Sequence, residues 1–150
     1  MTTNRAFRAE ELMQTRFEIQ TNGPRLYEFT DHVAAWLQGA GDGLLTLLVQ
    51  HTSTSLLIQE NADPDVQRDL RAYFSRLVPH SDTDQMSYLV HTLEGPDDMP
   101  AHIKAAMLPV SLSIPVQSGR MVLGTWQGLF LFEHRDAPHR RQIAAHFRSD

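Results

Sequence analysis

The sequence predicts an α+β fold: a single compact domain with a large antiparallel sheet and a few packed helices. Its 150 residues are enough for one hydrophobic core without disulfides or metal. A hydrophobic content of 41% beside 21% charged residues is ordinary for a globular protein. Two helical patterns occupy the first two thirds of the chain, and the last third alternates as antiparallel strands do.

Composition excludes several classes of protein. No apolar run is long enough to cross a membrane, so no membrane partner is expected. A net charge of -5 argues against a general nucleic-acid binder. The absence of cysteine excludes disulfides, thiolate metal ligands and a cysteine nucleophile. Residues 1–11 lack the apolar segment of a secretory signal, so we expect an N-terminal extension, a domain over 12–150 and a cytoplasmic location.

The first third contains strand, helix and strand patterns in that order. Residues 13–21 alternate with period two, which predicts a half-buried strand that ends at Asn22 to Pro24. A helix is predicted over about 26–37, with Thr30 or Asp31 capping its core and glycines ending it. The apolar run 44–49 follows the turn signal at Gly41 to Gly43 and predicts a buried strand.

The middle of the chain carries two further helix starts. After a short strand at 56–58, Asp63 is placed to cap a helix with Pro64 at its first position, running to about residue 77. Residues 79–87 predict a loop. Gly95 and Pro96 mark a turn, and Pro100 can begin a helix that ends near residue 107.

The last third predicts antiparallel sheet. Strands at 112–116 and 121–123 are joined by the hairpin signal Ser118-Gly119. Residues 124–128 interrupt the pattern, which indicates a bulge or a close approach of backbone. A strand at 129–132, a turn at 136–138 and a last strand at 143–147 complete the sheet.

The densest polar chemistry follows the strand at 44–49. His51 comes where that strand leaves the core, and the four hydroxyl residues 52–55 come directly after it. Small hydroxyl side chains and free backbone N–H groups suit an anion such as phosphate. The alternative is that these residues are ordinary strand and turn residues.

Three histidines lie at the edges of predicted elements, beside carboxylate, amide or hydroxyl residues. With one carboxylate, His51, His91 and His102 could bind zinc or a similar metal and leave a position open for water or substrate. Their spacing matches no compact ligand motif. One histidine could instead shuttle protons, or Ser53 or Ser55 could be a nucleophile activated by histidine.

A second constellation suits a phosphorylated ligand. Asp97 and Asp98 could hold Mg²⁺ on a pyrophosphate, with Lys104 and arginines on the phosphate oxygens. Lys104 is the only lysine among 13 basic residues, which suggests a chemical role for it. The alternative is an acidic helix start with arginines on the surface. The candidate arginines are Arg120, Arg140 and Arg141.

Five sequence blocks together resemble one known family. They are His51-Thr-Ser-Thr-Ser, Glu60-Asn-Ala-Asp-Pro64, the stretch from Glu94 to Lys104, Ser111-Leu-Ser-Ile-Pro-Val116, and Gly119-Arg120 with Gly124-Thr-Trp-Gln-Gly128. In this order, from about residue 12 to 147, they resemble the YjbQ family, whose members are often called secondary thiamine-phosphate synthases. The resemblance implies an α+β homotrimer with a polar site that neighbouring subunits could share.

The resemblance also implies a reaction, the condensation of a pyrimidine-methyl pyrophosphate with a thiazole phosphate. A histidine cluster prefers zinc, nickel or iron to Mg²⁺, so a metal-binding protein or a metal-dependent hydrolase of another small phosphorylated ligand is the alternative. A non-enzymatic interaction module is a third hypothesis. We therefore expect a divalent metal cofactor, Mg²⁺ or a transition metal such as Zn²⁺. The expected catalytic residues are His51, His102, Lys104 and Glu133; the substrate-binding residues are Thr52, Ser53, Asn61, Asp97, Asp98, Arg120, Gln127 and Arg140; the metal ligands are His51, His91 and His102.

Overall fold

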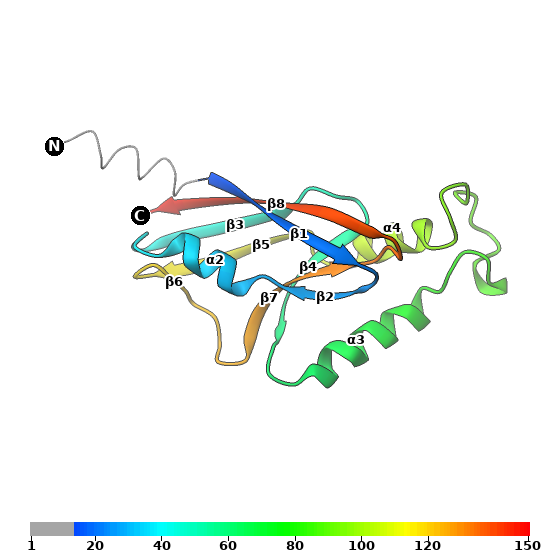
Figure 1. The fold of residues 1–150 in the computed structure, drawn as a ribbon, viewed down its shortest axis with the longest axis horizontal. Helices are drawn as coiled ribbons and strands as arrows, with labels where there is room; N and C mark the ends of the chain where they lie inside the picture. Colours follow the sequence, from blue (N-terminus) through cyan, green and yellow to red (C-terminus); the bar gives the residue numbers. More distant parts are fainter. Residues whose placement is uncertain (1–13) are drawn as a thin grey trace.

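The structure, a computed structural model, describes residues 14–150 and folds them as two antiparallel sheets with three helices (Figure 1). The expected extension over 1–11 and the start of the domain at residue 12 lie outside the described residues. The elements in chain order are β1 (Gln14–Asn22), β2 (Arg25–Glu28), α2 (Thr30–Leu37), β3 (Gly43–Val49), β4 (Thr54–Glu60), α3 (Pro64–Leu77), the 3-10 turn η1 (Asp84–Met86), α4 (Asp98–Met107), β5 (Ser111–Gln117), β6 (Arg120–Met121), β7 (Gln127–Glu133) and β8 (Pro138–Ser149).

The strands form two sheets, whereas the sequence predicted a single large one. Five strands pair in the order β1-β8-β3-β5-β6, and three pair in the order β2-β7-β4. The irregular residues between β6 and β7 carry the chain from the first sheet to the second. This crossover occurs within the interruption predicted at 124–128. At Gly128 the close approach is made by side chains and not by backbone: the three atoms nearest an added Cβ are side-chain atoms, with Glu28 Oε2 at 2.5 Å.

The main core lies between the two sheets, and this explains the burial of each strand. Leu45, Leu47 and Val49 of β3 face the core, whereas Leu44 and Leu48 are 44% and 47% exposed, so the strand predicted as buried is buried on one face only. Strand β7 is the strand covered on both faces. One face of the three-stranded sheet meets the five-stranded sheet, and the other carries a smaller cluster under α3.

The predicted helix at 26–37 is too long at its start. Residues 25–28 form β2, because Leu26 pairs opposite Phe132 and completes the three-stranded sheet. Helix α2 then begins at Thr30 without a side-chain cap, so neither Thr30 nor Asp31 caps it. The Thr30 hydroxyl instead donates to Glu28 (2.7 Å) and accepts from the Leu129 N–H (2.9 Å).

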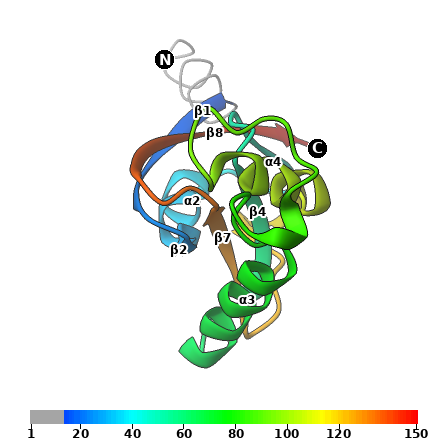
Figure 2. The same ribbon diagram turned by 90° about the vertical axis from the view of Figure 1, so that its right-hand side faces the viewer.

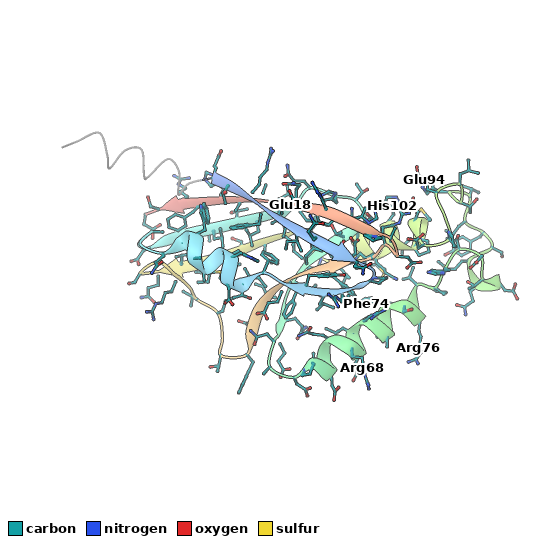
Figure 3. The ribbon with its side chains drawn as sticks, viewed as in Figure 1. Glu18, Arg68, Phe74, Arg76, Glu94 and His102 are labelled. Carbon is teal, nitrogen blue, oxygen red and sulfur yellow. The ribbon has the colours of Figure 1, made fainter. Side chains whose placement is uncertain are left out.

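Helix α3 begins as predicted, and it packs only partly against the sheets. The Asp63 carboxylate accepts from the Asp65 N–H at 2.9 Å, and Pro64 occupies the first turn. No α3 residue is fully buried, and Tyr73 is 59% exposed. The helix projects away from the sheets (Figures 1 and 2). In Figure 3, Phe74 points toward the sheets, where it packs against Phe132.

The C-terminal elements follow the predicted order with longer bounds. Helix α4 begins at Asp98, two residues before Pro100. Ser118 and Gly119 both have positive φ, as the predicted hairpin requires. Strand β8 spans twelve residues because it pairs with β1 on one side and β3 on the other. Within residues 14–150, no helix is long and apolar enough to cross a membrane.

Candidate metal centre and adjoining cavity

Most of the predicted site residues meet at one end of the molecule. Residues 51–53 precede β4, Glu133 ends β7 and Asp98 begins α4, which packs against β4. The loop before α4 brings His91 and Glu94 to the same end, and Figure 3 shows Glu94 near His102. The antiparallel pairing of β4 with β7 sets Thr54 opposite Glu133, so these chain-distant residues become neighbours.

Two histidines share one carboxylate oxygen. His91 Nε2 lies 2.7 Å and His102 Nε2 lies 3.2 Å from Asp98 Oδ2. One ligand atom from each of these three residues lies within 4.8 Å of the others. Asp98 is 2% exposed, whereas His91 and His102 remain partly open to solvent. Two imidazole nitrogens and a carboxylate oxygen are a donor set suited to a divalent transition metal.

The contacts of His102 turn its Nε2 toward Asp98, in the orientation of a metal ligand. Its Nδ1 lies 2.9 Å from the Thr52 carbonyl oxygen, which can only accept, so Nδ1 carries a proton and donates. In a neutral imidazole Nε2 is then unprotonated and its lone pair faces the carboxylate of Asp98. A cation at this position removes the repulsion between the two lone pairs. Metal-bound histidines commonly donate their other N–H to a backbone carbonyl in the same way.

Arg135 holds the two aspartates of the site in place. Its Nε donates to Asp97 Oδ2 (2.8 Å) and its Nη1 to Asp98 Oδ1 (2.7 Å). Burial alone would raise the pKa of Asp98, but hydrogen bonding from His91 and the charge of Arg135 hold it below the ordinary value. The Asp98 carboxylate is therefore ionised, as a metal ligand must be. Arg135 donates to Oδ1, so it leaves Oδ2 free for a metal.

Glu133 is the centre of a buried ion pair. Arg141 donates to both its oxygens, from Nε at 2.7 Å and from Nη2 at 2.6 Å. The Thr21 hydroxyl and the backbone N–H groups of His134 and Arg135 also donate to it. Burial works to raise the pKa of Glu133, but Arg141 and Thr21 hold it below the ordinary value. With 0% exposure and five donors, this carboxylate braces the site and has no free lone pair for substrate.

His51 does not join the other two histidines. The backbone N–H of Gln142 donates to its Nε2 at 2.8 Å, and Arg141 Nη1 lies 3.3 Å from its Nδ1. Burial and the neighbouring Arg141 charge lower the pKa of His51. The Gln142 N–H of β8 thus occupies the Nε2 of His51, and the described part of the chain groups Asp98, not His51, with His91 and His102.

A cavity of about 200 Å³ adjoins the aspartates, between α3, α4 and the end of β7. Lys104 and Asp97 line it, as does His134, whose Nε2 lies 2.9 Å from Ser55 Oγ. Burial lowers the pKa of Lys104, partly opposed by Asp136 and Asp97. Burial, together with the charges of Lys104 and Arg141, lowers the pKa of His134 to about 3.

The remaining predicted residues divide between this end and other places. Ser53 Oγ accepts from Arg141 Nη2 at 2.9 Å. Asn61 and Gln127 lie at the far end of β4 and β7, about 20 Å from Thr54 at about 3.3 Å per residue, so Asn61 is not beside His51 within one chain. Arg120 lies in the β5–β6 hairpin, and Arg140 is exposed, with Nε 3.8 Å from Glu18.

Sequence reasoning missed the roles of His134, Arg135 and Arg141. The first two follow Glu133 directly, and a charged triplet that ends an apolar strand was the available signal. The sequence favoured a surface position for Arg141. Its burial depends on Glu133, which is eight residues away in sequence and on another strand.

Comparisons with known proteins agree on one family. Residues 15–150 match the sequence model of the family described as UPF0047 protein YjbQ-like. A UPF0047 protein of Synechocystis is 50% identical over 130 residues, covering 85% of this chain and 86% of that protein. The UPF0047 protein YjbQ of Escherichia coli O157:H7 is 52% identical over 103 residues, covering 69% and 71%.

Solved structures show the same fold. A conserved hypothetical protein of Thermus thermophilus superposes with a TM-score of 0.78 at 34% identity, covering 89% of this chain and 99% of that one. A hypothetical protein of Aeropyrum pernix gives a TM-score of 0.79 at 26% identity, covering 91% and 98%. The names of the Synechocystis and Escherichia coli relatives state the family, and none of these four names states an activity.

Proposed function

Because the chain belongs to the YjbQ-like UPF0047 family and its His91, Asp98 and His102 could hold a metal ion, we propose that it is a metal-dependent enzyme acting on a small phosphorylated substrate. The observation that carries this proposal is the orientation of His102. Its Nδ1 donates to the Thr52 carbonyl, and its Nε2 faces Asp98 Oδ2 at 3.2 Å.

The donor set favours a transition metal such as Zn²⁺ over Mg²⁺. His91 and His102 would supply nitrogen, and Asp98 would supply oxygen, whereas Mg²⁺ prefers oxygen ligands throughout. Three protein ligands leave a position for water or substrate, as in catalytic zinc sites. A metal held there would supply a Lewis acid for a phosphoryl oxygen or an activated water. His91 and His102 are 47% and 30% exposed, so this open side is accessible to a small molecule.

The chain's own residues would hold this group rigid. Arg135 fixes Asp98 Oδ1 and Asp97 Oδ2, and the Thr52 carbonyl fixes the ring of His102. The buried pair of Glu133 and Arg141 braces the ends of the strands β4 and β7, next to Thr52 and Arg135. Precise support of this kind is what a metal site needs to keep its ligands in a reactive geometry.

Two reactions are compatible with this proposal. Hydrolysis of a small phosphorylated compound is favoured by the mixed nitrogen and oxygen donors. Condensation of a pyrimidine-methyl pyrophosphate with a thiazole phosphate is favoured by the five sequence blocks that resemble secondary thiamine-phosphate synthases. Of the two, the donor set supports metal-dependent hydrolysis better, and the condensation is the second candidate.

A homotrimer is a further part of the proposal. The outer face of the five-stranded sheet carries Leu44 and Leu48 beside a shallow hollow lined in part by Ala144 and His146. Exposed leucines on a regular sheet face are typical of surfaces that pair with another subunit. The trimer and the cytoplasmic location both stay predictions.

Elemental analysis of the purified protein tests the metal. We expect about one transition metal per chain in the wild type and loss of it in His102→Ala. His32→Ala on α2 is the matched control, since His32 is exposed and outside the site. Wild-type protein without bound metal after incubation with Zn²⁺ would contradict the proposal. Product analysis with each substrate class then separates hydrolysis from condensation.

A further inference from the structure

We infer that the cavity between α3, α4 and the end of β7 binds the phosphate group of a small phosphate ester. The inference rests on the proposed function, which places the reaction at the metal group. It adds where the phosphate group of the substrate binds. Four features of the cavity carry it: its size, its half-buried lysine, its histidine and the apolar part of its wall.

The cavity is small and largely enclosed. Its volume is about 200 Å³. A phosphate group with a short carbon skeleton fits such a space. The lining residues are Pro24, Arg71, Phe74, Ser75, Val78, His80, Asp97, Pro100, Lys104, Phe132, His134 and Asp136.

The cavity is lined by charges of both signs, but its cations form no direct ion pair. Asp97 Oδ2 already accepts from Arg135 and from the Asp136 N–H, and the Asp136 carboxylate lies 3.4 Å from His80 Nε2. Among residues 14–150, neither Lys104 Nζ nor the Arg71 guanidinium has a carboxylate within 4.0 Å. Lys104 is half-buried, and Asp136 and Asp97 act on its ammonium only from beyond ion-pair distance. A phosphate oxygen could therefore bind it directly.

His134 adds a neutral hydrogen-bonding group to the cavity. It is 2% exposed, and its Nε2 lies 2.9 Å from Ser55 Oγ. Where the Ser55 hydroxyl donates to Nε2, Nδ1 carries the proton and becomes a donor. No hydrogen bond within the described residues uses Nδ1, so it is available to a phosphate oxygen. Lys104 and His134 together would then hold two oxygens of one phosphate.

Part of the cavity wall is apolar. Phe74 and Phe132 meet edge to face with ring centroids 5.9 Å apart, and Pro100 lines the cavity from α4. These side chains suit a carbon skeleton rather than a second charged group. The cavity and the metal group are adjacent, because Asp97 lines the one, Asp98 belongs to the other and Arg135 contacts both. One small substrate could therefore reach both.

Binding of inorganic phosphate tests the inference directly. Its affinity is measured by isothermal titration calorimetry at constant ionic strength set with chloride. Compared with the wild type, Lys104→Met should weaken phosphate binding about tenfold or more, because a charge-assisted hydrogen bond is lost. Arg71→Met should weaken it in the same direction. Arg68→Met is the matched control on α3, and Figure 3 shows Arg68 and Arg76 pointing away from the sheets.

Two results would overturn the inference: wild-type protein that binds no phosphate at millimolar concentrations, or Lys104→Met that binds it as tightly as the wild type. An Arg71→Met effect no larger than that of Arg68→Met would also count against it. The variant His102→Ala separates the proposed metal site from the proposed phosphate cavity. If that variant binds phosphate normally and the wild type holds no metal, the proposed function fails and the cavity assignment stands. If the wild type binds metal but no phosphate, the cavity assignment fails and the metal site stands.

Discussion

Replacement of Glu133 by glutamine should destabilise the protein severely. The substitution Glu133→Gln keeps the shape of the side chain but removes the charge opposite Arg141, which is buried and lies 2.6 Å away. Removing one partner of a buried ion pair costs about 3–5 kcal/mol, because the other charge stays buried without compensation. The amide nitrogen would also face two or three of the five groups that now donate to Glu133, depending on which oxygen it replaces.

This cost converts into a measurable change in the melting temperature. For 150 residues the unfolding entropy is about 0.3 kcal/mol/K, from about 2.1 cal/mol/K per residue. A loss of about 3–5 kcal/mol then lowers the melting temperature by about 10–15 °C. Urea denaturation followed by circular dichroism measures the same loss as a free energy of unfolding.

An exposed ion pair between the first and last strands provides the control. Glu18 on β1 lies 3.8 Å from Arg140 on β8, and both side chains are largely exposed. Glu18→Gln should change the free energy of unfolding by less than about 0.5 kcal/mol. If Glu133→Gln costs less than about 1 kcal/mol, or no more than the control, the reasoning about the buried pair is refuted.

The pH dependence of the free energy of unfolding gives a second measure of how the Glu133 carboxylate stabilises the protein. The pKa of Glu133 is lower in the folded protein than the ordinary value of 4.5, so the unfolded chain binds more protons at acid pH. The stabilisation is therefore complete above about pH 4.5 and is lost as the pH falls through the folded-state pKa. In Glu133→Gln this part of the acid sensitivity should be absent. If the free energy of unfolding falls equally with acid pH in the wild type and in Glu133→Gln, this prediction is contradicted.

Three other substitutions test the metal group, the packing of α3 and the approach at Gly128. Asp98→Asn should reduce metal affinity more than about tenfold in competition with a chelator, and unchanged affinity would remove Asp98 from the ligand set. Phe74→Ala should cost about 2 kcal/mol in urea denaturation, because Phe74 packs on the sheet, whereas exposed Tyr73→Ala should cost less than about 0.5 kcal/mol; equal costs would refute the packing of α3. Gly128→Ala should cost about 1–3 kcal/mol, because the new Cβ would lie 2.5 Å from Glu28 Oε2, and an unchanged melting temperature would show that the sheet accommodates it.

Features set by neighbouring residues were predictable from the sequence. The Asp63 cap with Pro64 behind it requires only two adjacent residues, and the structure contains it. The hairpin at Ser118-Gly119 likewise requires only residues that tolerate positive φ. The alternating strand at the start of the domain and the run at 44–49 also follow from local pattern. The five blocks identified the family, and the comparisons confirm it.

Features that depend on distant partners were not predictable in this way. Residues 25–28 fit a helical pattern, but Leu26 gains a strand partner in Phe132, and the pairing outweighs the weak local preference. The division into two sheets depends on which strands β7 joins, and no local signal states this. For the same reason the leucines of β3 could not be divided into buried and exposed faces.

The site shows the same division. The sequence by itself determined that histidines, aspartates and a single lysine occur near element edges, and it placed His91, His102 and the Asp97-Asp98 pair among the candidates. Only the tertiary structure decided that Asp98 joins the two histidines while β8 occupies His51. It also decided that Arg141 reaches Glu133 in the core. Hydrogen-bond and charge partners are set by distances across the fold, and sequence spacing does not determine those distances.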